Sequence, residues 1–149
     1  MNILLCVDGS AESTKAVVKA VEIADGCRID DVAVLHVYQP KDMVITGYSP
    51  KDHFEHETAR LKEENDAIVA EAEKILKHAV LRFQEKGIEP KQILKEGHPA
   101  HTISQVAEED GYDLVIMGSR GKGGLKKILL GSVSNAVIQE THASVLVVK

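Results

Sequence analysis

One segment of the sequence combines many glycines with an unusual charge. Residues 118–137 read GSRGKGGLKKILLGSVSNAV, with five glycines and four basic side chains. No Asp or Glu occurs from Leu114 to Gln139, although the whole chain has a formal net charge of −5. Glycine-rich backbone beside positive charge suits a phosphate group, because exposed amides can approach it closely. This segment is therefore the first candidate for chemistry.

Two common phosphate-binding motifs do not match this segment. A P-loop would need a lysine where Gly124 stands, and a dinucleotide fingerprint would need a glycine where Lys126 stands. The segment nevertheless leads from a predicted strand into a predicted helix that Gly131 and Ser132 open. The first amides of a helix are unpaired and its dipole favours an anion, so a phosphate site remains the preferred interpretation. The alternative is a surface loop whose lysines are solvated.

The rest of the chain predicts the elements that position this segment. Strand-like apolar runs cover 3–7, 31–38, 91–96, 113–118 and 143–149, and helical spacing follows each of the first four. Ser10 is the candidate N-cap of the first helix, and the other helices are expected at 53–86, 97–111 and 132–142. Strands that alternate with helices predict a three-layer α/β/α sandwich. We expect a five-stranded parallel doubly wound sheet of order 3-2-1-4-5 with four helices, as a single domain over residues 1–149, with ligands at the carboxyl ends of the strands.

Composition excludes several classes of function. Hydrophobic residues make up 44% of 149 residues, which is enough for a core. Aromatic residues are only 3%, Trp is absent and the charge is acidic, so no nucleic-acid partner is expected. No apolar run is long enough for a signal peptide or a membrane span. Cys6 and Cys27 lack the spacing of a metal or redox pair, which favours reduced thiols and a cytoplasmic location.

Other residues could carry chemistry, each with a simpler alternative. Asp8 is a catalytic carboxylate or a turn residue at the end of a strand. His53 with His56, and His98 with His101, have helical spacing but no evident third metal ligand, so surface and capping roles are preferred. The sequence DGSAES after the first strand contains no histidine, which disfavours nucleotidyl transfer.

The spacing of the glycines resembles a known signature. Gly118-x-x-Gly121, nine residues and then Gly131-Ser132 is similar to the G-2x-G-9x-G-[S/T] pattern of the ATP-binding branch of the universal stress protein family. Further blocks resemble that family in the same order and cover essentially the whole chain: VDGS at 7–10, LHVY at 35–38, EGHPAHTI at 96–103, YDLVIMGSRG at 112–121 and SVLVVK at 144–149.

The resemblance implies a ligand and the residues that hold it. ATP would bind with Mg²⁺ or Mn²⁺, the metal being held largely by phosphate oxygens. Cys6 would line the adenine pocket, where some relatives carry proline, Asp8 would lie near the ribose, and Val37 would meet the adenine with its backbone. The remaining expected nucleotide-binding residues are Met117, Gly118, Ser119, Arg120, Gly121, Lys122, Gly123, Gly124, Gly131, Ser132, Val133 and Ser134.

The sequence therefore predicts an ATP-binding stress-response or signalling protein that acts through its nucleotide state and an unknown protein partner. A homodimer is expected through the last strand, Ala143 to Lys149, because a long apolar edge strand invites pairing. The loop from Gln39 to Asp52 is expected to be a flap near the nucleotide or the dimer partner. Two alternatives stay open: an ATPase or phosphotransferase that uses the same site, and an interaction module whose site is vestigial.

Overall fold

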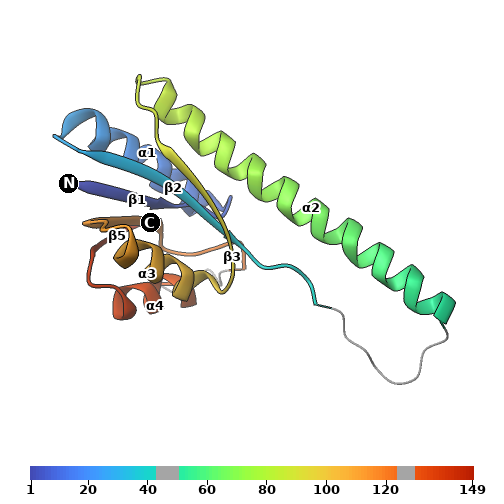
Figure 1. Ribbon diagram of the computed structural model, residues 1–149. Helices are drawn as coiled ribbons and strands as arrows, with labels where there is room; N and C mark the ends of the chain where they lie inside the picture. Colours follow the sequence, from blue (N-terminus) through green and yellow to red (C-terminus); the bar gives the residue numbers. More distant parts are fainter. Residues whose placement is uncertain (43–50, 124–129) are drawn as a thin grey trace.

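The computed structural model describes residues 1–42, 51–123 and 130–149, and it alternates strands and helices along the chain (Figure 1). The strands are β1 (Asn2–Cys6), β2 (Asp31–Tyr38), β3 (Lys91–Glu96), β4 (Leu114–Gly118) and β5 (Ser144–Val148). The helices are α1 (Ala11–Gly26), α2 (Lys51–Gln84), α3 (Pro99–Glu109) and α4 (Ser132–Glu140).

The five strands form one parallel sheet in the order β3-β2-β1-β4-β5, which confirms the predicted topology. The chain moves one way across the sheet from β1 to β3 and the other way from β3 to β5. Because crossovers between parallel strands are right-handed, the change of direction sends α1 and α2 to one face and α3 and α4 to the other (Figure 1). The direction reverses between the neighbouring strands β1 and β4, so the connections that follow these two strands leave toward opposite faces of the sheet.

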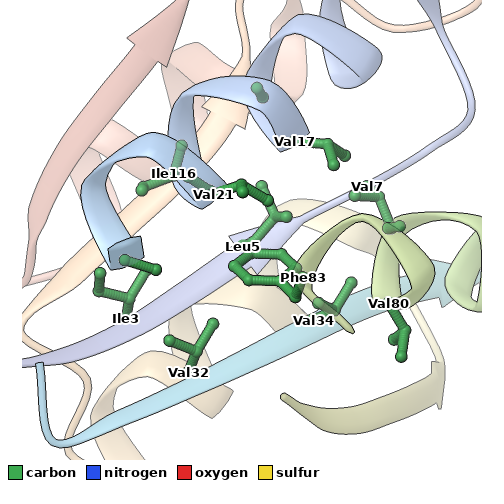
Figure 2. Packing of buried hydrophobic residues seen from close by; sticks show 14 of the residues in the cluster. Ile3, Leu5, Val7, Val17, Val21, Val32, Val34, Val80, Phe83 and Ile116 are labelled. Carbon is green, nitrogen blue, oxygen red and sulfur yellow. The ribbon is translucent and has the colours of Figure 1, made fainter. Parts of the chain in front are cut away.

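The face covered by α1 and α2 holds the larger helices against the sheet. Phe83 of α2 is fully buried and lies beside Leu5 and Val34 of the sheet (Figure 2). In α1 the predicted apolar stripe is buried throughout, and the Ser10 hydroxyl caps the helix by accepting the amide of Ser13 at 3.1 Å. Helical spacing and the N-cap are both confirmed here.

The opposite face presents a short row of side chains at the end of the sheet. Cys6 of β1 stands in register with Leu35 of β2 on one side and with Met117 of β4 on the other. All three are buried in the core cluster that also includes α3 residues. This row lies near the carboxyl ends of the strands, so it is placed to form the floor of a ligand site.

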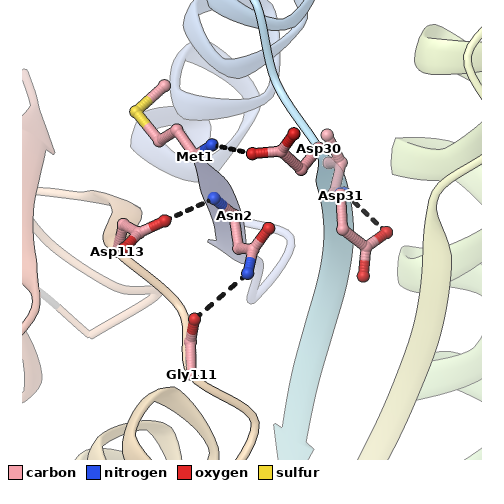
Figure 3. Close-up of polar contacts among 7 residues, drawn as sticks. Met1, Asn2, Asp30, Asp31, Gly111 and Asp113 are labelled. Atoms are coloured by element: carbon pink, nitrogen blue, oxygen red, sulfur yellow. Dashed lines mark hydrogen bonds and ion pairs between the residues drawn. The ribbon is translucent and has the colours of Figure 1, made fainter.

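The amino ends of the strands are closed by polar contacts (Figure 3). The amino group of Met1 pairs with Asp30, and the backbone amide of Asn2 donates to the carboxylate of Asp113 at 2.7 Å. The Asn2 side chain also donates to the carbonyl of Gly111 at 3.3 Å. These contacts tie the starts of β1, β2 and β4 together at the edge opposite the expected site.

Helix α2 begins at Lys51, close to the predicted start, and its first half projects beyond the sheet (Figure 1). Its buried residues begin at Ala72 among those described. Lys41 fastens the projecting part: its backbone exchanges two hydrogen bonds with the Asn65 side chain, and its ammonium group pairs with Glu64 at 2.9 Å. That contact lowers the pKa of the Glu64 carboxyl.

One expectation lies largely outside this description. Most of the predicted flap, residues 43–50, falls outside the described residues. Within the described ranges, no helix has both the length and the apolar composition that crossing a membrane requires.

Candidate functional site

A cavity of about 500 Å³ opens at the carboxyl ends of the strands. Its volume lies in the range of small-molecule sites, which is roughly 300–1,000 Å³. It occupies the point at which the strand order reverses, where ligands of doubly wound sheets bind. Among the described residues it is lined by Cys6, Val7, Asp8, Leu35, Val37, Pro99, Ile103, Met117, Gly118, Arg120, Gly121, Gly123, Leu130, Gly131, Ser132, Val133 and Ser134.

One end of the cavity is apolar. The row of Leu35, Cys6 and Met117 forms its floor, and Pro99 and Ile103 of α3 add a wall. Burial raises the pKa of the Cys6 thiol far above its usual range, so the thiol stays neutral. A flat, largely apolar group would bind favourably at this end, because both the group and the floor would be removed from water.

Hydrogen bonds beneath this end fix the two central strands. The amide of Val7 donates to the carbonyl of Leu35 at 2.9 Å, which extends the pairing of β1 with β2. The buried ring of His36 donates through Nδ1 to the carbonyl of Val7 at 2.6 Å. These contacts fix the backbone at Val7, so that the next residue, Asp8, lies at the cavity.

The other end of the cavity is formed by backbone of the glycine-rich segment. The carbonyl of Ser119 accepts the amide of Gly131 at 2.7 Å and the hydroxyl of Ser134 at 2.9 Å. This pairing brings the start and the end of the segment together. Gly131 is the N-cap of α4, and no described side chain caps this helix. The first amides of α4 can therefore bind an anion at the rim of the cavity.

Asp8 lies where the apolar floor meets the glycine-rich rim. Its Oδ1 accepts the amide of Ser10 at 2.9 Å, and its own amide donates to the Ser13 hydroxyl at 3.1 Å. Its Oδ2 lies 2.7 Å from the position that a Cβ on Gly121 would take. Any side chain at residue 121 would displace the carboxylate, which explains the glycine there.

Gly118 has a packing role in addition to the binding role expected from the sequence. It lines the cavity, but a Cβ on this residue would lie 2.8 Å from backbone atoms of Glu12 and Ser13. The missing side chain therefore allows the first turn of α1 to pack against the end of β4. This packing alone is enough to require glycine at residue 118.

Arg120 also departs from the expectation of a purely basic segment. Its guanidinium Nη2 lies 2.7 Å from Oε1 of Glu12, and both side chains are largely buried. Its backbone carbonyl accepts the Ser10 hydroxyl at 3.3 Å. Glu12 is 108 residues away in the sequence, so the local absence of acids did not reveal this pairing.

Most of the residues expected from the sequence meet at this cavity. The exceptions are Ser119, which is buried and holds the segment together, and Lys122, whose stem lies beside Gly9. Gly124, Lys126 and Lys127 lie outside the described residues. Lining residues that the sequence did not suggest are Val7, Leu35, Pro99, Ile103 and Leu130.

The described members of the two histidine pairs lie on the surface. His56, His98 and His101 are exposed, and the side chain of His53 lies outside the description. Within the described part of the chain, no group of three or more His, Cys, Asp or Glu side chains could hold a metal ion. The two cysteines are free thiols, Cys6 buried and Cys27 exposed.

The fold and the cavity define a doubly wound α/β protein with a cavity at the switch point of its sheet. The sequence profile of the universal stress protein family matches residues 1–149, and the chain belongs to this family. Universal stress protein YxiE of Bacillus subtilis is 36% identical over 98% of this chain and 97% of its own length. Universal stress protein MJ0577 of Methanocaldococcus jannaschii is 31% identical over 93% and 89%, respectively.

Solved structures have the same fold. The structure of MJ0577 superimposes with a TM-score of 0.79 at 29% identity, covering 99% of this chain and 94% of that one. A universal stress protein solved in complex with cAMP has a TM-score of 0.66 at 23% identity, covering 99% and 95%. At that identity the likeness concerns the fold.

The packing at Gly118 makes a prediction about stability. We expect Gly118→Ala to lower the free energy of unfolding by about 1–3 kcal/mol, because the new methyl group would overlap the backbone of α1. Gly123→Ala is the matched control, since a Cβ there meets nothing within 4 Å, and its effect should stay within about 0.5 kcal/mol. Urea unfolding of both variants gives the comparison. Equal stabilities would contradict the proposed packing role.

Proposed function

We propose that this chain is an ATP-binding stress-response protein and that the cavity is its nucleotide site. The observation that carries the proposal is the polarity of one continuous cavity: an apolar floor at one end and the N-terminus of α4 at the other. A nucleotide has the same division, with a flat base at one end and phosphates at the other.

The phosphate end is suited to an anion through backbone more than through side-chain charge. Gly131 and Ser132 line the cavity at the start of α4, where unpaired amides and the helix dipole favour negative charge. These residues belong to the signature that resembles the ATP-binding branch of the family. The universal stress protein solved with cAMP adds that a protein of this fold can hold a nucleotide.

The expected residue roles follow from this orientation. Cys6 and Val37 would lie beside the base, and Asp8 at the junction between the apolar floor and the glycine-rich rim would reach the ribose. The backbone at 118–124 and 131–134 would surround the phosphates. Asp8 is the one carboxylate among the described lining residues, so Mg²⁺ or Mn²⁺ would take most of its oxygen ligands from the phosphates and water.

A charge placed at the start of α4 tests the phosphate end. Ser132→Asp should weaken ATP binding about tenfold or more, because the carboxylate competes for the same amides and repels the phosphates. The fold should not suffer, since an acid in the first turn of a helix is favourable. Isothermal titration with ATP and with adenosine measures the effect.

Gln139→Glu is the matched control for this variant, since it adds the same charge to an exposed residue in the same helix. It should leave the affinity for ATP within about twofold, because the charge is far from the helix start and screened by salt. Equal weakening by both variants, or loss of adenosine binding as severe as loss of ATP binding, would argue against the proposed phosphate end.

An ATPase or phosphotransferase is the second candidate, and the carboxylate of Asp8 in the cavity favours it. Fast hydrolysis requires a group that positions or deprotonates water in line with the last phosphate. Asp8 already accepts the Ser10 amide, and no histidine lines the described part of the cavity. We therefore expect steady-state phosphate release slower than about 1 per second, below the typical enzyme range. Faster release that Asp8→Asn abolishes would establish the enzyme.

A homodimer through the last strand is part of the proposal. β5 is an edge strand, and Val145 to Val148 remain partly exposed. Pairing with a second copy would cover this edge. Light scattering at micromolar concentration should give a dimer mass, and Val147→Lys should shift it toward the monomer. Ile138→Lys, at an exposed residue of α4, is the control, and a monomeric unmodified protein would contradict the dimer.

A further inference from the structure

We propose that Glu12 sets how strongly the nucleotide site prefers ligands with several phosphates, by neutralising Arg120 at the cavity rim. This inference rests on the proposed nucleotide-binding function and adds a residue that does not itself line the cavity. Glu12 belongs to the first turn of α1, whereas the expected binding residues lie in other segments of the chain.

The contact is specific and shielded from water. Arg120 lines the cavity, and its Nη2 lies 2.7 Å from Glu12 Oε1. The Arg120 side chain is 26% exposed and the Glu12 side chain is 17% exposed. Partial burial of both partners makes their charges count more than those of an exposed surface pair.

The described charges around the glycine-rich rim then balance. Arg120 and Lys122 contribute two positive charges, while Asp8 and Glu12 contribute two negative charges. Among the described residues, the rim therefore attracts an anion mainly through backbone amides, and these four side chains add little long-range attraction. Each added phosphate on a ligand therefore raises its affinity less than the basic sequence of the segment suggests.

The position of Glu12 is fixed by contacts on both sides. The Ser10 hydroxyl binds the Arg120 carbonyl, and the absence of a side chain at Gly118 places the backbone of Glu12 directly against β4. Glu12 also lies in the first turn of a helix, where its negative charge is favoured by the dipole. The carboxylate is thus held beside the rim, where it pairs with the guanidinium of Arg120.

Glu12→Gln is the direct test, because it removes the charge and keeps a side-chain oxygen that can accept from Arg120. Titrations of ATP, AMP and adenosine without divalent metal compare ligands that carry three, one and no phosphates. We expect the affinity for ATP to rise about fivefold or more, the affinity for AMP to rise less, and the affinity for adenosine to stay within about twofold. The gain for ATP should shrink at high salt.

Three further variants separate charge from packing. Glu12→Asp keeps the carboxylate and should restore the unmodified preference for ATP over AMP. Adding Arg120→Gln to Glu12→Gln should remove the gain, because the positive charge that Glu12 offsets is then absent. Glu22→Gln changes an exposed acid on the same helix, paired with Lys19, and should leave all three affinities unchanged. Thermal unfolding checks that every variant remains folded.

The outcomes distinguish this inference from the function on which it rests. If the unmodified protein binds ATP but Glu12→Gln binds it no more tightly, the proposed role of Glu12 is wrong. The proposed nucleotide site is not affected by that result. An equal change for ATP, AMP and adenosine also overturns it, since that pattern reports packing. If the unmodified protein binds none of the three ligands, both the proposed function and this inference are wrong.

Discussion

The first turn of α1 packs directly against the end of β4, and the geometry of the cavity rim depends on this contact. Gly118 permits it, because any Cβ there would overlap the backbone of Glu12 and Ser13. The Ser10 hydroxyl then serves both elements, capping α1 and donating to the carbonyl of Arg120. With the start of the glycine-rich segment held in this way, Ser119 can bind Gly131 and Ser134 and place the N-terminus of α4 at the cavity.

The topology of the sheet explains why the cavity forms at this place. The connections after β1 and β4 leave toward opposite faces, so the sheet opens where these neighbouring strands end. The floor comes from a single row across β2, β1 and β4, while the rim comes from the two ends of one segment. An apolar surface and a set of backbone amides thereby line one cavity.

The sequence predicted the fold because its signals were local and repeated. Apolar strands, the helical stripe of α1 and the cap at Ser10 all depend on neighbours along the chain. The residues of the cavity wall were harder to predict, because the periodicity of α3 marks Ile103 as buried without indicating that it lines the cavity. The Glu12 to Arg120 pair could not be read from composition, since the acid and the base come from distant segments. The packing role of Gly118 could not be predicted for the same reason, because the backbone of Glu12 and Ser13 lies far from it in the sequence.

The central claim is that the cavity binds a nucleotide with its phosphates at the N-terminus of α4 and its base on the apolar floor. Backbone amide NMR during titration with ATP tests it most directly, because each residue reports separately. The account predicts that the amides of Ser132, Val133 and Ser134 shift with ATP and much less with adenosine, while the amides of Cys6 and Val37 shift with both. Shifts confined to other elements, or no saturable shifts at all, would contradict it.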